Sequence, residues 1–358
     1  MTAALHDHRP ARASGFSLIE LLVGITIALI GIVIMFQVME NSENRKRTTA
    51  AGSDAQIAGS IAMHNLERDV RLGGNGFGSS TAVGCTVNAY DTVRGTAFTF
   101  PMVPVQIIDG AAGAPDQIIV LYGNATTAAT AYNFIESSAT SKKMASTSSR
   151  GGLRRGDIAF VTGASCGLIE ITDNTHIDQL TIDHAAGAYT NALNEAATAR
   201  FNAPGGFTIP SGQLFSLGEN TLPRRNIWQI TNGRTLTLTD DLHFTGAMEV
   251  GEGIIDLQAE YGLDTDGDFQ ADTWQATDPA PWTQAIAVRV ALLARSQQYE
   301  KASVTTTAPT WAAGAFVMTN LDGSADSNPD DPNDWRHYRY RVYQTTIPLR
   351  NMIWGTTP

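Results

Sequence analysis

The segment Phe16–Phe36 is an apolar run that contains only three clearly polar residues, Ser17, Glu20 and Thr26. A helix of about 21 residues is long enough to cross a hydrocarbon core roughly 30 Å thick. A carboxylate near the start of such a helix is costly and usually marks a functional position, unless its side chain reaches the headgroups. The run therefore predicts a membrane-embedded helix, and Glu20 is the residue that needs an explanation.

The residues before this run differ from an ordinary secretory signal. Such a signal has a basic region, then an apolar region, then a small-residue cleavage site. Here the first 15 residues form a short polar segment with two arginines, Arg9 and Arg12. The apolar run begins only after Gly15. Cleavage after Gly15 would leave the apolar segment on the mature chain. The motif Gly15-Phe16-Ser17-Leu18-Ile19-Glu20 resembles the class III leader of type IV prepilins at every position.

This resemblance implies a role for each residue of the motif. Gly15 would precede the bond that prepilin peptidase cuts on the cytoplasmic side, and Phe16 would become the N-methylated terminus. Glu20 would pair with the terminal amine of a neighbouring subunit during assembly, because an opposite charge within about 4–6 Å makes a buried carboxylate tolerable. Arg9 and Arg12 would keep the N-terminus cytoplasmic. The expected location is the bacterial inner membrane, crossed once, with the globular domain in the periplasm and then in the pilus.

A single long helix is predicted over residues 16–72, because no proline interrupts this stretch and Gly73-Gly74 follow at once. Apolar residues at every fourth position predict a ridge that packs on a domain, and the charged residues between them predict a polar face. The ridge consists of Ala58, Ala62, Leu66 and Val70, and the polar face of Glu67, Arg68, Asp69 and Arg71. The predicted segments are a leader (1–15), a transmembrane and assembly helix (16–39), the periplasmic half of the helix (40–72) and a β-rich domain (73–358).

Short β-rich runs bounded by turn residues predict strands after the helix. They lie at residues 116–123, 156–172, 226–240, 285–295 and 339–351, and Asn232-Gly233 predicts a hairpin turn inside the third run. Residues 125–150 and 302–335 are rich in Ala, Thr, Ser, Asp and Pro and predict long loops. One long helix followed by antiparallel strands gives an α+β fold, which is the pilin-like architecture that the leader already implies.

Three stretches of the large domain resemble the PilW family of minor pilins: YGLDTDGD (261–268), VRVALLAR (288–295) and TTIPLRN (345–351). The resemblance implies a structural protein that primes type IV pilus assembly, near the pilus tip. The implied partners are other minor pilins, the major pilin, prepilin peptidase, the inner-membrane assembly platform and a PilY-type tip adhesin. Two alternatives stay open: a type II secretion pseudopilin, and an adhesin or DNA-binding pilus subunit.

Composition argues against nucleic-acid binding and against catalysis. The formal net charge is −11, and an acidic surface opposes non-specific binding to phosphate backbones. The sequence contains no HExxH, CxxC, GxSxG or P-loop motif, and its seven histidines lack metal-ligand spacing. We therefore expect neither an enzyme nor a nucleic-acid receptor.

The two cysteines, Cys85 and Cys166, lie well beyond the predicted anchor. An even number of cysteines in an exported domain predicts one disulfide, and two free buried thiols are the alternative.

The acidic stretch at residues 264–272 predicts a structural calcium site. Asp264, Asp266, Asp268 and Asp272 can converge on one hard cation, and Gly267 supplies a tight turn. The stretch matches an EF-hand loop only partly, because its sixth residue is Phe269 and its twelfth is Gln275. The alternative is a solvated acidic turn. No other cofactor is expected.

Overall fold

The computed structural model describes residues 17–78, 80–124, 131–145, 152–173, 180–324, 331 and 333–353. The predicted leader, including Gly15 and Phe16, lies outside these residues. The chain divides into two compact units, residues 1–52 and residues 53–358. The first contains the beginning of the long helix, and the second contains its remainder together with all the described strands.

Helix α1 spans Leu18–Leu72, close to the predicted 16–72. Gly74 follows it with φ +80°, a conformation that favours glycine, and its N–H donates to the Leu121 carbonyl. The Nδ2 of Asn351 donates to the carbonyls of Leu72 and Gly73 at 3.3 and 2.9 Å. These bonds satisfy carbonyls that the end of a helix leaves without an intrahelical partner.

The predicted apolar ridge of α1 packs on the domain, and the predicted polar face is wrong at one position. Ala62, Leu66 and Val70 are buried in the core. Asp69, expected on the polar face, is also buried, because its carboxylate accepts hydrogen bonds from Asn226 and Trp228. A charged residue beside an apolar ridge can enter the core when the opposing strand supplies donors.

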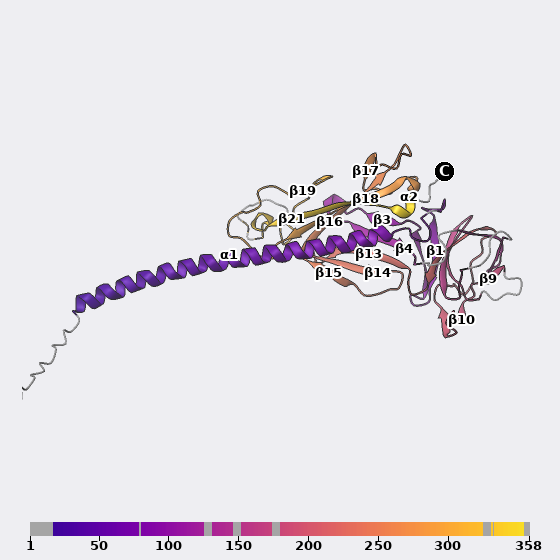
Figure 1. Ribbon diagram of the computed structural model, residues 1–358, viewed down its shortest axis with the longest axis horizontal. Coiled ribbons are helices and arrows are strands. Elements are labelled where there is room, and N and C mark those ends of the chain that lie inside the picture. The colour runs from indigo at the N-terminus through magenta and orange to yellow at the C-terminus, as the bar shows by residue number, and fades with distance from the viewer. Residues whose placement is uncertain are drawn as a thin grey trace, which may run out of the picture. The chain divides into compact units, whose positions relative to one another are not determined.

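Two antiparallel sheets enclose the main core with residues 53–72 of α1 (Figure 1). The five-stranded sheet has the order β15-β14-β13-β4-β3, and the four-stranded sheet has the order β17-β16-β18-β21. Their strands are β3 (Val105–Ile108), β4 (Gln117–Tyr122), β13 (Arg224–Thr231), β14 (Thr235–Asp240), β15 (Met248–Glu252), β16 (Ile254–Leu263), β17 (Thr273–Gln275), β18 (Ala285–Arg295) and β21 (Tyr340–Pro348). The predicted strands at 116–123, 226–240, 285–295 and 339–351 are thereby confirmed, as is the turn at Asn232-Gly233.

An eight-stranded sheet lies beyond the end of α1 at Leu72 (Figure 1). Its order is β2-β1-β8-β7-β12-β5-β6-β9, and its pairs are antiparallel except for β1 with β8. Its strands are β1 (Thr86–Asp91), β2 (Thr96–Pro101), β5 (Tyr132–Ser137), β6 (Ser141–Met144), β7 (Asp157–Thr162), β8 (Cys166–Glu170), β9 (Thr181–Asp183) and β12 (Gly212–Glu219). β7 and β8 confirm the run at 156–172. The prediction of a long loop at 125–150 is wrong in part, because β5 and β6 form a short hairpin there. The small polar residues around the hairpin gave no strand pattern.

The remaining described elements are short. Two hairpins form small sheets of their own, β10 (Gly187–Thr190) with β11 (Ala196–Ala199) and β19 (Thr310–Trp311) with β20 (Gly314–Ala315). The others are α2 (Arg350–Ile353) and the 3₁₀ turns Ala111–Gly113, Trp282–Gln284 and Trp335–His337. The described part of 302–335 is otherwise irregular, as predicted.

A close approach fixes α1 against β21 at Gly59. A Cβ atom at this position would lie only 2.3 Å from Cε2 of the Tyr343 ring. The Tyr343 hydroxyl donates to the Gln56 carbonyl at 2.9 Å, which holds the ring across the helix. Glycine is therefore required here by packing and not by backbone conformation.

Candidate functional site

The first half of α1 is apolar on every side. Its segment Leu18–Glu40 is long and apolar enough to cross a membrane, and none of it is buried within the protein. Apolar side chains around the whole circumference need a lipid or protein environment. Thr26 fits such an environment, because its hydroxyl donates to the Val23 carbonyl at 2.8 Å within the same helix.

Glu20 lies in the first turn of α1, and its side chain is exposed. A carboxylate in this position interacts favourably with the unpaired N–H groups at the helix N-terminus. The structure describes no cation beside Glu20 in residues 17–40. The residues expected to meet it or to be processed, Gly15 and Phe16, lie outside the described part of the chain. The assembly role of Glu20 therefore stays a prediction.

The predicted Cys85–Cys166 disulfide is present, and the two cysteines are 81 positions apart in the sequence. Cys85 precedes β1, and Cys166 begins β8. These strands form the parallel pair of the eight-stranded sheet, in which Val87 pairs with Cys166 and Asn88 with Gly167. Asn88 Nδ2 also donates to the Cys166 carbonyl at 3.2 Å. The disulfide therefore reinforces a pairing that is only two residues long.

The acidic loop brings together three of the four aspartates predicted as calcium ligands. One carboxylate oxygen from each of Asp264, Asp266 and Asp268 lies within 4.8 Å of the other two. Asp272 is not part of this group, because its carboxylate accepts 2.7 Å hydrogen bonds from the Thr265 N–H and hydroxyl. These bonds lower the Asp272 pKa. They close the loop between β16 and β17 around the other three acids.

Backbone donors already serve all three grouped carboxylates, and Asp266 accepts from the Asp268 N–H at 3.2 Å. Asp264 accepts from the N–H groups of Gly267 at 2.7 Å and Phe269 at 2.9 Å, and Asp268 accepts from Gln270 at 2.8 Å. Phe269 has φ +66°, and Gly267 has φ +86°. The loop thus presents three oxygens to one point in a conformation that its own backbone supports.

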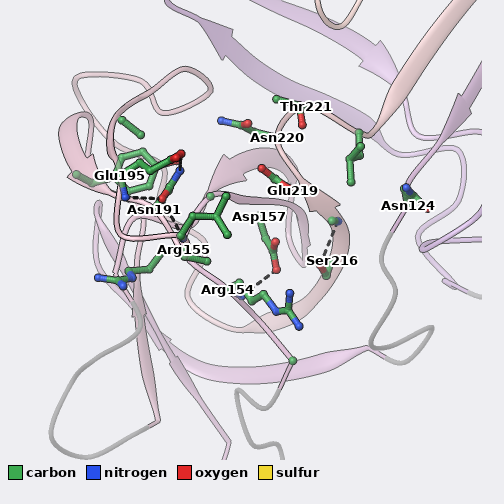
Figure 2. Close-up of a pocket in the computed structure, with 18 residues that line it drawn as sticks. Asn124, Arg154, Arg155, Asp157, Asn191, Glu195, Ser216, Glu219, Asn220 and Thr221 are labelled. Carbon is green, nitrogen blue, oxygen red and sulfur yellow. Dashed lines mark hydrogen bonds between the residues drawn. The ribbon is translucent and has the colours of Figure 1, made fainter.

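A polar cavity of about 450 Å³ lies between the β10–β11 hairpin and the eight-stranded sheet (Figure 2). Figure 2 shows Asp157 and Glu219 on one side, and Asn191 hydrogen-bonded to Glu195 on another. Asp157 is buried, and its carboxylate accepts a 2.8 Å bond from the Arg154 N–H. Burial raises its pKa to about 6, and the negative charge of Glu219 adds to the rise.

The described residues that line this cavity offer charges and amides but no histidine or cysteine. They include one serine, Ser216, whose hydroxyl accepts a 3.3 Å bond from the Gly218 N–H. Within the described lining, Ser216 is therefore not paired with a base of the kind that covalent catalysis uses. The cavity was not predicted from the sequence, because its residues come from four separate strands and loops.

Comparison with known families gives two matches. Residues 10–36 match the prokaryotic N-terminal methylation motif, and residues 229–351 match the family described as Type IV Pilus-assembly protein W. Neither a search of curated proteins nor one of solved structures gives a match.

The second match covers much of the part of the domain that packs on α1. It begins within β13, after Trp228, and runs through β21, so it includes the whole four-stranded sheet, the acidic loop and the helix-capping Asn351. Strands β3 and β4, which belong to the same core, precede it. The eight-stranded sheet and the disulfide precede it. This family is one of structural pilus-assembly proteins. With the motif at its N-terminus and this domain behind the helix, the chain matches a PilW-family type IV pilin, as its sequence predicted.

Proposed function

We propose that this protein is a minor pilin that primes assembly of a type IV pilus and stays near its tip. The observation that carries the proposal is the presence, in one chain, of the methylation motif at 10–36 and the pilus-assembly match at 229–351. The exposed apolar segment Leu18–Glu40, most of which lies within the first match, supports it, because it can lie first in a bilayer and then among the helices of other subunits.

In this proposal the chain is cut after Gly15, Phe16 is methylated, and Glu20 meets the terminal amine of a neighbouring subunit. The globular domain is periplasmic, a placement supported by Arg9 and Arg12 before the apolar run. The disulfide also supports it, because such bonds persist in oxidising compartments. The partners proposed are the other minor pilins, the major pilin, the assembly platform and a PilY-type tip adhesin.

The test separates processing from assembly. Intact-mass analysis of protein made with its own peptidase should show loss of residues 1–15 and one added methyl group. Deletion of the protein should reduce the number of pili, and a Glu20→Gln variant should not restore it although it is still processed. Glu40→Gln, at the other end of the apolar segment, is the matched control and should restore pili. Restoration by Glu20→Gln would refute the assembly role.

We also propose that the acidic loop binds calcium as a structural ion. Support comes from the three convergent carboxylate oxygens, since Ca²⁺ prefers oxygen ligands and several of them. Backbone carbonyls and water would complete the shell, and the ion would fix the connection between β16 and β17.

A further inference from the structure

A second cavity, of about 590 Å³, opens on the face of the four-stranded sheet that points away from α1. Asp256 of β16 and Leu293 of β18 are paired neighbours in its wall. Alternate residues of β16, such as Leu257 and Ala259, face the helix and the main core. Asp256 therefore points to the opposite face. The loop that contains Val317 and Asn320 forms the other side of the cavity.

Asp256 is buried without a cation. It is 5% exposed, and its carboxylate accepts a 2.9 Å bond from Gln258 Nε2. In the described part of the chain it forms no ion pair. Burial raises its pKa to about 6, which means that the surroundings penalise the charged form. A carboxylate in this state gains from any positive group that reaches it.

Asn320 also lines this cavity and is itself buried. It is 4% exposed, and its Oδ1, which is shielded from solvent, has no hydrogen-bond partner among the described residues. Its Nδ2 donates to the Ser324 hydroxyl at 3.2 Å, and the Gly323 N–H donates to its carbonyl at 2.9 Å, so a turn holds the residue in place. An unpaired buried oxygen is uncommon, because leaving it unbonded costs about 1–3 kcal/mol.

The two arginines of the cavity are already engaged. Arg234 forms an ion pair with Glu252. The Arg295 guanidinium lies 5.1 Å from the centre of the Tyr338 ring. Asp256 is then the described acid in the lining, beside the neutral polar side chains of Asn320, Asn232 and Thr319. Apolar side chains, including Val317 and Leu293, line the space beside them.

We propose that this cavity binds the cationic side chain of an arginine or lysine from another protein. The charged head would meet Asp256 and Asn320, and the aliphatic stem would lie along the apolar wall, as such stems commonly do. The net charge of −11 favours a basic partner surface, as do the exposed acids Asp109 and Asp322, which are close in sequence to lining residues. That the partner is a pilus subunit rests on the proposed function. The site itself does not.

The direct test uses butylguanidinium as the probe and butylurea as its neutral counterpart of the same shape. Saturation-transfer NMR on the full-length protein in detergent micelles should show saturable binding of butylguanidinium. Butylurea should bind at least about tenfold more weakly, because it lacks the charge that a buried carboxylate requires. Equal binding of the two probes, or no saturable binding of butylguanidinium, would overturn the proposal.

Two pocket variants and a matched control locate the binding. Asp256→Asn keeps the shape and should weaken butylguanidinium binding at least about tenfold. Asn320→Asp adds a second acid and should strengthen it several-fold. Glu195→Gln, which removes an exposed acid from the other cavity, should leave it unchanged. Unaltered binding by both pocket variants, with their thermal melts intact, would refute the site.

A last measurement identifies the partner. Pilus subunits that co-purify with the unaltered protein should be reduced in Asp256→Asn and retained in Glu195→Gln. If Asp256→Asn loses probe binding but keeps its partners, the cavity is a cation site and the assignment to a pilus subunit is wrong. Failure of the probe experiment leaves the pilin function untouched, and failure of the Glu20 experiment leaves the cavity untouched.

Discussion

The indole Nε1 of Trp228 donates a 2.7 Å hydrogen bond to the Asp69 carboxylate, joining β13 to α1 inside the core. The Asn226 side-chain amide donates to the same carboxylate at 2.9 and 3.0 Å. Burial raises the Asp69 pKa, while these hydrogen bonds oppose the rise. One carboxylate on the helix therefore aligns two side chains of the opposing strand.

Asp69→Ala should destabilise the protein by about 2–4 kcal/mol, because it leaves the buried Trp228 N–H unpaired and Asn226 with the Tyr122 hydroxyl as its remaining described partner. The measurement is the thermal melt of the full-length protein in micelles, followed by circular dichroism. Arg68→Ala, at the exposed neighbouring position, should change stability by no more than about 0.5 kcal/mol. Equal melts for the two variants would show that the Asp69 network contributes nothing.

Asp256→Asn should raise stability at pH 7.5 and lose this advantage near pH 4.5. The folded-state pKa of about 6 exceeds the ordinary 3.8, so the folded protein binds this proton more tightly than the unfolded chain. Its contribution to stability is therefore fully present below about pH 4 and is lost as pH rises through 6. A shift of about two units corresponds to about 3 kcal/mol as an upper limit.

Thermal melts at the two pH values test this prediction. The exposed acid Asp109 provides the comparison, since Asp109→Asn should alter the melt little at either pH. A lower melting temperature for Asp256→Asn at pH 7.5 would mean that the ionised carboxylate is stabilising.

Removal of the Cys85–Cys166 disulfide should destabilise the eight-stranded sheet before the rest of the domain. The two-residue pairing of β1 with β8 is weak without a covalent link, and opening a loop of 81 positions costs about 4 kcal/mol in the chain-entropy model. A thiol assay on denatured, unreduced protein should find no free cysteine. Hydrogen exchange in Cys85→Ser/Cys166→Ser should rise first in β1 and β8, and uniform protection would contradict this view.

Gly59→Ala should destabilise the protein by about 1–2 kcal/mol, although alanine is the better helix former by about 1 kcal/mol. The cause is the Tyr343 ring, which has no room for the added methyl group. Ser60→Ala, on the exposed side of the same turn, should be neutral or slightly stabilising. Restoration of the melt when Gly59→Ala is combined with Tyr343→Ala would identify the contact, and an unchanged melt in the single variant would rule it out.

Calcium should raise the melting temperature of the full-length protein, and a chelator should reverse the effect. A ligand present at about 100 times its Kd stabilises by about 2.7 kcal/mol. Asp266→Asn should abolish the response, whereas Asp322→Asn, in another acidic loop, should retain it. Identical melts with calcium and with chelator would leave residues 264–272 as a solvated turn.

Local patterns in the sequence predicted the helix and the strands well. The proline-free stretch, the glycines at 73–74 and the Asn232-Gly233 turn each act over a few residues, so they can be read without knowing the fold. The hairpin of β5 and β6 was not predicted, because the segments that flank it consist mostly of small and polar residues. Its register depends on β12 and β9, which lie far along the chain.

The burial of individual polar side chains could not be predicted from the sequence alone. Lys142 is fully buried, and its Nζ lies 2.7 Å from both the Phe207 carbonyl and His184 Nε2. Nothing near position 142 signals this, because both partners are remote in sequence. Asp69 and Asp256 are hidden for the same reason. From sequence alone, a charged residue is predicted to lie on the surface. Only the fold shows whether it is buried, and whether hydrogen-bond donors or a cation lie beside it.

The contact at Gly59 and the hydrogen bonds at Asp69 lie ten positions apart on α1, about 15 Å along its axis. Because α1 is attached at both positions, residues 59–69 cannot rotate or slide against the sheets unless the Gly59 contact or the Asp69 hydrogen bonds break. A pull along this segment would load both attachments in shear, together with the core between them. Mechanical tension that reaches residue 59 would therefore be shared between the helix and both sheets instead of acting on a single contact.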